Sequence, residues 1–524
     1  MRTLCLAILT VAMLAPAGHS DELFDKLTAD VSKGKAIKNG MKALEIFFRY
    51  DSEMRGGGRK ATAAIGKRAK ALTVLLEWLD ETETTLGTDL RKQHKTVLEF
   101  AERARAKLLN TKYSKNKIQY VRVDAKGYER FEYAAWMPRA YTHQIKKGKP
   151  WPAIISMHGR VIDPGHPSFR AGAATERGRK AIWNNWLKSP TADQAIIIAP
   201  TGDPKGFLLR DKVYEDFGQL YSSMREVLSR YRVDWNRIFV EMEGSALRLA
   251  CYQPFMFAGV IVRDYIEDRR GTAIPPEEMF ILDNLNGLPL CYIADEKHWD
   301  TVGKPMSEAL TAAYAKAGAP QNLIILKAKR NANEALRNPK DDAKIAAFIA
   351  KHRRIEKRET FSWRFFNPFM RSPLPVDLTG ANYSYDEGVP LAKTAGAFTF
   401  KYKLETVDNK PVNVFDFTVT EVESLRIDLH DGIADLNYPI TIKVNGKVVK
   451  ENATVKRDWE FFFDKIAPGF LWMVPFVGSI TADCDPKPQY TPPGETKPAN
   501  GEKTDTPKKD GAATGAAGDG AKGK

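Results

Sequence analysis

Between 115 and 358, short continuous apolar runs alternate with segments of helical periodicity, and this pattern constrains the fold more than any other feature. Strands that are buried on both faces have uninterrupted Val/Ile/Leu runs, and helices between such strands cover a mostly parallel sheet on both sides. The sequence therefore predicts an α/β fold here. The expected strands are IQYVRVDA, RFEYAAWMP, PAIISMHG, AIIIAPTG, RIFVEM, FAGVIVRD, LPLCYIAD and NLIILKAK. The expected helices are ERGRKAIWNNWLKS, YEDFGQLYSSMREVLSRY, SEALTAAYAKAG and DDAKIAAFIAKHRR.

The two flanks of this region have other periodicities. Residues 21–114 carry apolar side chains at three- and four-residue spacing, which predicts a small helical bundle or hairpin. Residues 359–485 hold short strand-like runs separated by turn residues, which is typical of a small β-sandwich. Asn445-Gly446 predicts a two-residue hairpin turn. The aromatic run WEFFF, 459–463, is expected to form a further short strand.

The two ends of the chain are expected to lie outside these domains. Residues 1–20 combine Arg2, an apolar stretch and small residues, the pattern of a secretory signal peptide. No apolar stretch approaches the roughly 18 residues that a membrane span needs. Residues 486–524 are rich in Pro, Gly, Ala and Lys, and we expect them to be disordered. These features predict export to the periplasm, the cell surface or the extracellular space, without a transmembrane segment.

Charge and cysteine content limit which partners, disulfides and metals are expected. The formal net charge of +15 favours contact with an anionic surface or polymer, and nothing in it specifies a nucleic acid. After removal of the signal peptide the cysteines are Cys251, Cys291 and Cys484, too few for a disulfide scaffold. Buried free thiols are expected, and a Cys251–Cys291 bridge stays open. No CxxC pair or His/Cys cluster is present, so neither a metal nor a cofactor is expected.

Several stretches resemble one family. VDWNRIFV and RLACYQPFMFAGVI resemble the strand before, and the helix after, the nucleophile of secreted bacterial esterases related to polyhydroxybutyrate depolymerases and feruloyl esterases. PWPAIISMHG is similar to their oxyanion strand, and LNGLPLCYIADEKHWD is similar to the strand and loop that carry the acid. The resemblance covers most of 117–356. It implies an α/β-hydrolase fold, and a small-molecule ester or a polymer as the ligand.

The nucleophile of this family would correspond to Ser245. In the family the serine lies on a tight strand-to-helix turn of the form G-x-S-x-G. Here the turn reads EMEGSAL, with Glu243 at the first glycine position and Ala246 and Leu247 after the serine. A carboxylate at Glu243 disfavours an alkoxide beside it. The alternative is that Ser245 only caps the helix that follows.

The acid and the base of the triad match the family less well than the serine does. The resemblance implies Asp300 as the acid, and Asp295, nearer the strand end, stays open. A histidine base should follow the strand NLIILK, yet the stretch AKRNANEALRNPK contains none. His352 comes late in the last helix. His298, in the acid loop, is the substitute, with the order of the triad broken.

The oxyanion loop is better preserved. His158-Gly159-Arg160 corresponds to the H-G motif whose following backbone N–H groups stabilise the oxyanion in the family. Arg160 replaces a glycine and would bind an anion through its charge. The alternative is that His158 has only a structural role.

Three functions follow from these residues. The sequence favours a catalytically degenerate esterase homologue, a pseudoenzyme with a binding or scaffold role. One alternative is an active serine esterase with a rearranged site made of Ser245, His298 and Asp300. The other is a basic interaction protein of the cell envelope.

Overall fold

The structure is a computed structural model that divides into two compact units, Met1–Lys487 and Pro488–Lys524. All elements named below belong to the first unit. The expected signal peptide, the expected tail and His158-Gly159-Arg160 lie outside the described residues. The structure describes residues 42–50, 59–86, 113, 115–123, 131–142, 150–157, 182–200, 220, 224, 228, 230–243, 245–264, 281–330, 336–355, 358–365, 370, 375–381, 396–466 and 476–484.

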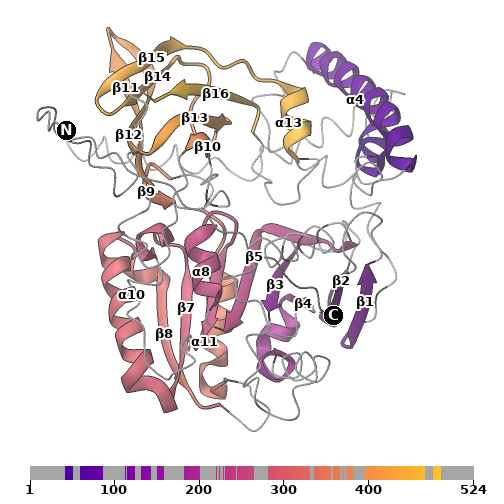
Figure 1. The fold of residues 1–524 in the computed structure, drawn as a ribbon. Helices are drawn as coiled ribbons and strands as arrows, with labels where there is room; N and C mark the ends of the chain where they lie inside the picture. Colours follow the sequence, from indigo (N-terminus) through magenta and orange to yellow (C-terminus); the bar gives the residue numbers. More distant parts are fainter. Residues whose placement is uncertain are drawn as a thin grey trace, which may run out of the picture. The chain divides into compact units, whose positions relative to one another are not determined.

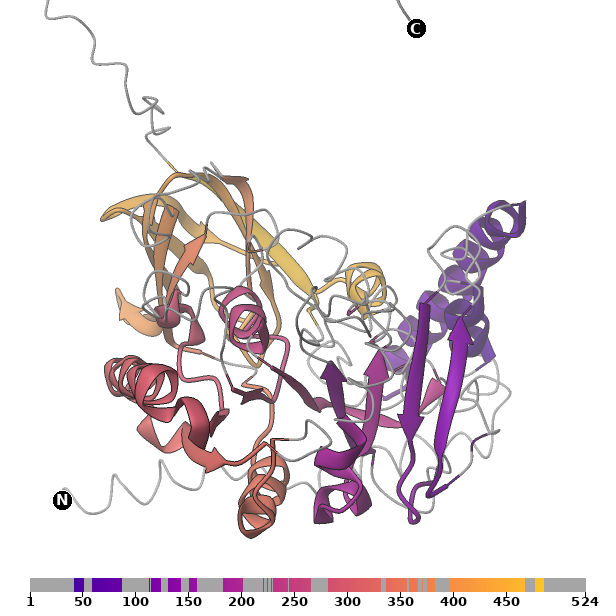
Figure 2. The ribbon, with the colours of Figure 1, turned by 60° about the horizontal axis from the view of Figure 1, so that its bottom comes forward.

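An eight-stranded sheet forms the centre of the α/β region, in the order β1-β2-β4-β3-β5-β6-β7-β8 (Figures 1 and 2). The pairings from β4 through β3 to β8 are parallel, and those of β1 with β2 and β2 with β4 are antiparallel. The predicted mostly parallel sheet is confirmed. The strands are β1 Ile118–Val123, β2 Phe131–Trp136, β3 Trp151–Met157, β4 Ile196–Pro200, β5 Val233–Glu243, β6 Gly259–Arg263, β7 Leu290–Asp295 and β8 Leu323–Ala328.

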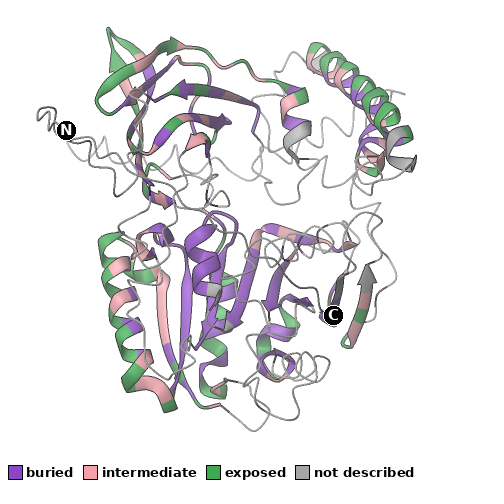
Figure 3. Ribbon diagram, viewed as in Figure 1, coloured by how far each residue is buried: buried purple, intermediate pink, exposed green. Residues whose placement is uncertain are grey.

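Helices cover both faces of this sheet. On one face Val240 and Tyr292 pack with side chains of α8, Ser245–Tyr252, and α10, Lys304–Lys316. On the other face Phe239 and Ile261 pack with α11 and with a helical turn over 182–186. Because both faces are covered, β7 is buried along its whole length (Figure 3), which explains its uninterrupted apolar sequence. Helix α11 is Asp342–Lys351, and the short helical segments are η3 Pro190–Asp193, η4 Leu282–Leu285, η5 Glu296–His298, the π-helical η6 Trp299–Gly303, η7 Pro320–Asn322 and η8 Pro339–Asp341.

Two antiparallel-rich sheets follow the α/β region. One has five strands in the order β15-β14-β12-β11-β9, and the other has three in the order β10-β13-β16. Phe398, Phe400 and Phe417 of the five-stranded sheet and Leu425 and Ile427 of the three-stranded sheet belong to one buried cluster. The strands are β9 Thr360–Phe365, β10 Val376–Ala381, β11 Gly396–Val407, β12 Lys410–Thr420, β13 Val422–Leu429, β14 Ile440–Val444, β15 Lys447–Ala453 and β16 Gly478–Asp483.

The hairpin predicted at Asn445-Gly446 is confirmed. It joins β14 to β15, and Asn445 and Gly446 have φ angles of 49° and 79°. Two positive φ angles in succession define the type I′ turn, which matches the twist of paired strands. The Asn445 side chain also accepts a hydrogen bond from the N–H of Val419 at 2.8 Å, which ties the turn to β12.

The strand expected for WEFFF is wrong, because these residues begin helix α13, Trp459–Ile466. Asp458 caps this helix by accepting hydrogen bonds from the N–H groups of Glu460 at 2.8 Å and Phe461 at 3.4 Å. Trp459, Phe462 and Phe463 recur at helical spacing on its buried face. The aromatic composition suggested a strand, but the cap and the spacing decide the local structure.

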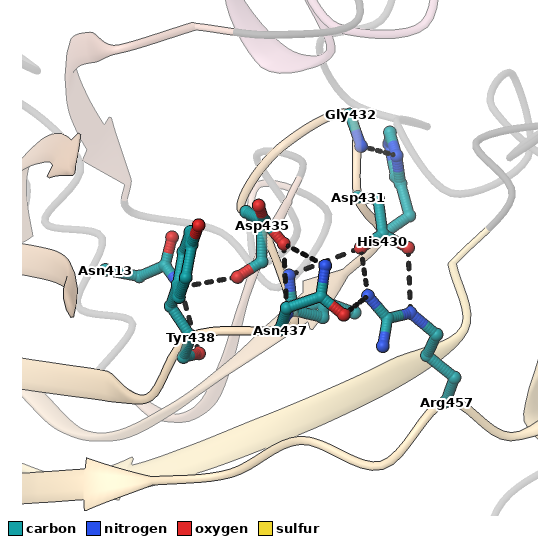
Figure 4. Close-up of polar contacts among 9 residues, drawn as sticks. Asn413, His430, Asp431, Gly432, Asp435, Asn437, Tyr438 and Arg457 are labelled. Carbon is teal, nitrogen blue, oxygen red and sulfur yellow. Dashed lines mark hydrogen bonds and ion pairs between the residues drawn. The ribbon is translucent and has the colours of Figure 1, made fainter. Parts of the chain in front are cut away.

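Polar contacts hold the connection between β13 and β14 (Figure 4). The Arg457 guanidinium donates to both carboxylate oxygens of Asp431, with a distance of 3.0 Å from Nε to Oδ2. The buried Asn413 side chain on β12 donates to the carbonyls of Asp435 at 2.8 Å and Tyr438 at 3.1 Å. These bonds satisfy backbone groups that no strand partner reaches, so the loop has a defined path without a regular element.

The N-terminal helices contact α13. A helical segment over 42–50 and helix α4, Arg59–Leu86, are described in the region predicted to be helical. The rings of Phe47 and Phe463 lie 5.8 Å apart in an edge arrangement. The indole of Trp459 donates to Glu83 at 3.3 Å. Among the described helices, none combines the length and the apolar character that crossing a membrane requires.

The cysteines Cys251, Cys291 and Cys484 are free and buried, as expected, and no Cys251–Cys291 bridge forms. Burial raises the pKa of the Cys291 thiol to about 12 and that of Cys484 to about 11. The thiolate is the reactive form, so we expect no reaction with a disulfide reagent near pH 8 in the folded chain lacking 1–20. All three thiols should react after unfolding in guanidinium. Rapid labelling of the folded chain would contradict the burial.

Candidate functional site

The carboxyl ends of β5 to β8 lie along one edge of the sheet, because these four strands are neighbours and parallel. Ligands of open α/β sheets bind at this edge. Glu243 ends β5, Asp264 follows β6, Asp295 ends β7 and Arg330 comes two residues after β8. This edge therefore gathers ionisable residues from four separate stretches of sequence.

The predicted nucleophile turn lies at this edge. Strand β5 ends at Glu243 and helix α8 begins at Ser245, so a single residue, Gly244, separates them. The side chains of Glu243 and Ser245 lie outside the described part of the chain. In the neighbouring strand β3, Met157 pairs with Met242. The described backbone therefore has a strand followed closely by a helix, the order of a nucleophile elbow.

The residues of the predicted acid loop differ in how far they are buried. Asp295 ends β7 and is buried, with its Oδ1 accepting from the N–H of Lys297 at 3.0 Å. His298 lies at the end of η5 with 32% of its side chain exposed. Asp300, in η6, is exposed. The described carboxylates beside His298 are those of Asp264 and Asp295.

Asp264 is a residue that the sequence reasoning missed. It is buried, its φ angle is +58°, and its N–H donates to the carbonyl of Ile293 on β7 at 2.7 Å. Asp tolerates this left-handed conformation better than most residues, and such positions are enriched at functional sites. Its Oδ2 lies 3.8 Å from Nδ1 of His298. The available signal was its position directly after the strand-like run GVIVR, at a strand end.

Arg330 faces both buried carboxylates. Its Nη2 lies 3.4 Å from Oδ2 of Asp264, and its Nε lies 3.5 Å from Oδ2 of Asp295. The two carboxylate side chains are each 4% exposed, whereas Arg330 is 25% exposed. Arg330 follows β8, which is where the family resemblance implies a histidine base. A guanidinium stays protonated near neutral pH and cannot accept a proton from a serine.

The arrangement has the charges to bind a cation or a polar ligand, but it is a poor triad. The distance of 3.8 Å between Asp264 and His298 exceeds that of a hydrogen bond, so among the described side chains the Asp264 carboxylate does not orient the imidazole as a general base requires. Asp264, Asp295 and His298 offer one ligand atom each, all within 4.8 Å of one another. These are the described residues that a metal ion would use, although the sequence predicted no metal.

A buried polar network lies inside the sheet, close to this edge. Glu241 on β5 and Arg263 on β6 form an ion pair in which each side chain is 2% exposed. Ser156 on β3 donates to Glu241, and the indole of Trp186 donates to it at 2.9 Å. Arg263 also donates to the carbonyl of Leu336 at 2.7 Å and lies over the Trp186 ring at 5.2 Å from its centroid. Because its members are enclosed, this network serves structure and not ligand contact.

Comparison with known proteins gives distant structural similarity. No family model matches the sequence. No curated protein matches it either. A thermostable esterase has 14% identity and a TM-score of 0.32, with 45% of this chain and 63% of that chain covered. A methylesterase has 11% identity and a TM-score of 0.30, with coverages of 50% and 62%. The poly(3-hydroxybutyrate) depolymerase LpqC from Bordetella parapertussis has 12% identity and a TM-score of 0.29, with coverages of 44% and 94%.

At these identities and TM-scores the similarity carries no argument about activity or substrate. The fold is assigned from the sheet of this chain. The eight-stranded sheet is parallel from β4 through β3 to β8, and its β5 is followed closely by helix α8. Helices cover both of its faces. The chain therefore has an α/β-hydrolase-like domain, preceded by helices and followed by antiparallel-rich sheets.

Proposed function

We propose that this chain is an exported α/β-hydrolase-fold protein that has lost serine-esterase turnover and keeps the edge formed by β5 to β8 for binding. Export is proposed from the signal-peptide pattern of 1–20. The ligand proposed from the motif resemblance is a small-molecule ester or a polymer. The absence of turnover is proposed from the site residues, and one observation carries it.

That observation is the position of Arg330. It comes two residues after β8 and makes ion pairs with both buried carboxylates of the edge, Asp264 and Asp295. In a working triad a carboxylate accepts a hydrogen bond from the base and stabilises the imidazolium that forms. Here a permanent cation faces both of these buried carboxylates. A serine at Ser245 therefore lacks an oriented proton acceptor at the place where the family provides one.

The decisive test is covalent labelling of Ser245. We expect a fluorophosphonate probe to leave the purified chain unlabelled under conditions in which an active serine esterase is labelled completely. Turnover of p-nitrophenyl acetate or butyrate should equal that of a Ser245→Ala variant. Loss of a triad member lowers catalysis by about 10³-fold or more, so any remaining activity should be at background.

The active-esterase alternative is favoured by His298, whose Nδ1 lies 3.8 Å from Oδ2 of Asp264. If the probe labels the chain and Ser245→Ala abolishes the labelling, the proposal of lost turnover is wrong. A further loss in His298→Ala, with full labelling in Asp300→Asn, would then identify His298 as the base. That result would also favour Asp264, and not the exposed Asp300, as the carboxylate partner of His298.

A further inference from the structure

The side chains of Asp264, Asp295 and His298 form a ligand set of mixed chemistry. They offer two carboxylate oxygens and one imidazole nitrogen, all within 4.8 Å of one another. Bonds from a zinc-type ion to such ligands measure about 2.0–2.2 Å, which places ligand atoms around one ion roughly 3–4 Å apart. Small rotations of these side chains are therefore enough to bring the three atoms onto one ion.

Two atoms of this set lack a hydrogen-bond partner. Among the described residues, Oδ1 of Asp264 and Nδ1 of His298 are both buried without one. Buried polar atoms in folded proteins are almost always paired, with protein, water or an ion. Asp264 is itself only 3% exposed, so solvent does not readily supply the missing bond. A metal ion bound between the Asp264 carboxylate and Nδ1 of His298, which lies 3.8 Å from Oδ2, gives the imidazole nitrogen a partner, and a rotation of the carboxylate brings Oδ1 to the same ion.

The charge of the edge also favours a cation. Two buried carboxylates face one guanidinium, that of Arg330, at distances of 3.4 and 3.5 Å. Neither contact has the paired, two-bond geometry in which Arg binds carboxylates most strongly. Arg330 is also 25% exposed, so its guanidinium has a path to solvent. It therefore acts as a weak internal competitor for the position of an ion.

We propose that Asp264, Asp295 and His298 bind a divalent transition-metal ion of the zinc type at the carboxyl ends of β6 and β7. An imidazole nitrogen among the ligands favours such an ion over magnesium or calcium, which prefer oxygen ligands alone. Three protein ligands leave coordination positions open to water or to a bound molecule. The inference goes beyond the proposed function and stands whether or not Ser245 reacts with a probe.

The test is isothermal titration of Zn²⁺ into the tag-free chain after treatment with EDTA, with Mg²⁺ as the comparison ion. We expect one saturable Zn²⁺ site and no comparable Mg²⁺ binding. His298→Ala, Asp264→Asn and Asp295→Asn should each weaken Zn²⁺ binding by more than about tenfold, because even the loss of an outer partner of a metal ligand costs about that much. Asp264→Asn removes the charge and keeps a residue that tolerates a positive φ.

Two further variants sharpen the test. Asp300→Asn is the matched control, because Asp300 is an exposed carboxylate two residues from His298, and its Zn²⁺ affinity should equal that of the wild type. Arg330→Gln removes the competing cation and should strengthen binding, an effect opposite in sign to that of the ligand variants. Should the buried aspartate variants fail to fold, the partly exposed His298→Ala decides the question. An absent Zn²⁺ site, or one that His298→Ala leaves unchanged, overturns the proposal.

Discussion

Replacing Arg263 with Ala is expected to lower the free energy of unfolding by about 3–5 kcal/mol, because the change leaves a buried carboxylate without its charge partner. Glu241 and Arg263 are each 2% exposed, and no route to water compensates either charge. The carboxylate keeps its donors Ser156 and Trp186, and these neutral groups replace only part of the lost interaction. Urea unfolding followed by tryptophan fluorescence measures the change.

The control for this prediction is an exposed ion pair in the same region. Lys316 and Asp283 lie 2.8 Å apart with 70% and 34% of their side chains exposed. Lys316→Ala should change the stability by less than about 1 kcal/mol, since solvent screens exposed pairs. The double variant Glu241→Leu/Arg263→Met should recover much of the loss, because it leaves no unpaired charge. A loss for Arg263→Ala as small as that for Lys316→Ala would contradict the assignment.

Asn284→Ala is expected to have the second largest effect, about 3 kcal/mol. The Asn284 side chain is fully buried in η4. Its amide hydrogen-bonds backbone groups of β9, as a neighbouring strand would. Its Nδ2 donates to the carbonyl of Arg364 on β9, its Oδ1 accepts from the N–H of Arg364, both at 2.8 Å, and Nδ2 also donates to the carbonyl of Cys251 at 3.1 Å. Asn286 repeats the pattern with Ser362, two residues earlier on β9.

Calorimetry tests this role of Asn284. The amide connects the α/β region with β9 of the five-stranded sheet, so its removal should convert a single cooperative transition into two. Asn322→Ala is the matched control, because the described bond of that amide, to the carbonyl of Gly287 at 2.7 Å, stays within the α/β region. It should cost about 1 kcal/mol and keep one transition. A single transition with an unchanged midpoint in Asn284→Ala would show that the hydrogen bonds of Asn284 do not contribute to stability.

The fold was more predictable than the site for a physical reason. Burial on both faces produces runs such as LPLCYIAD, and Asn445-Gly446 adopts the two positive φ angles of its turn, so local sequence carries both signals. Helix α13 was missed because its aromatic residues favour strands, while its cap depends on Asp458. Local composition predicts the wrong secondary structure where a single capping residue determines that a helix begins.

The site required knowledge of which strands are neighbours. Asp264 and His298 are far apart in the sequence and meet because β6 pairs with β7. Arg330 joins them because β7 pairs with β8. The sequence showed that a histidine base was missing after β8, and it directed attention to His298. It gave no sign that Arg330 faces both carboxylates, since ion pairs between strand ends leave no periodic pattern.

The contact between Phe47 and Phe463 has a consequence for the order of synthesis and assembly. The helical segment over 42–50 is made early, yet its buried aromatic partner is made only when most of the chain is complete. The apolar face of the N-terminal helices therefore stays uncovered while the sheets between them are being synthesised and folded. Uncovered apolar surface of this kind is a target for chaperones and a hazard for aggregation. The N-terminal helices should be the last part of the chain to complete their packing.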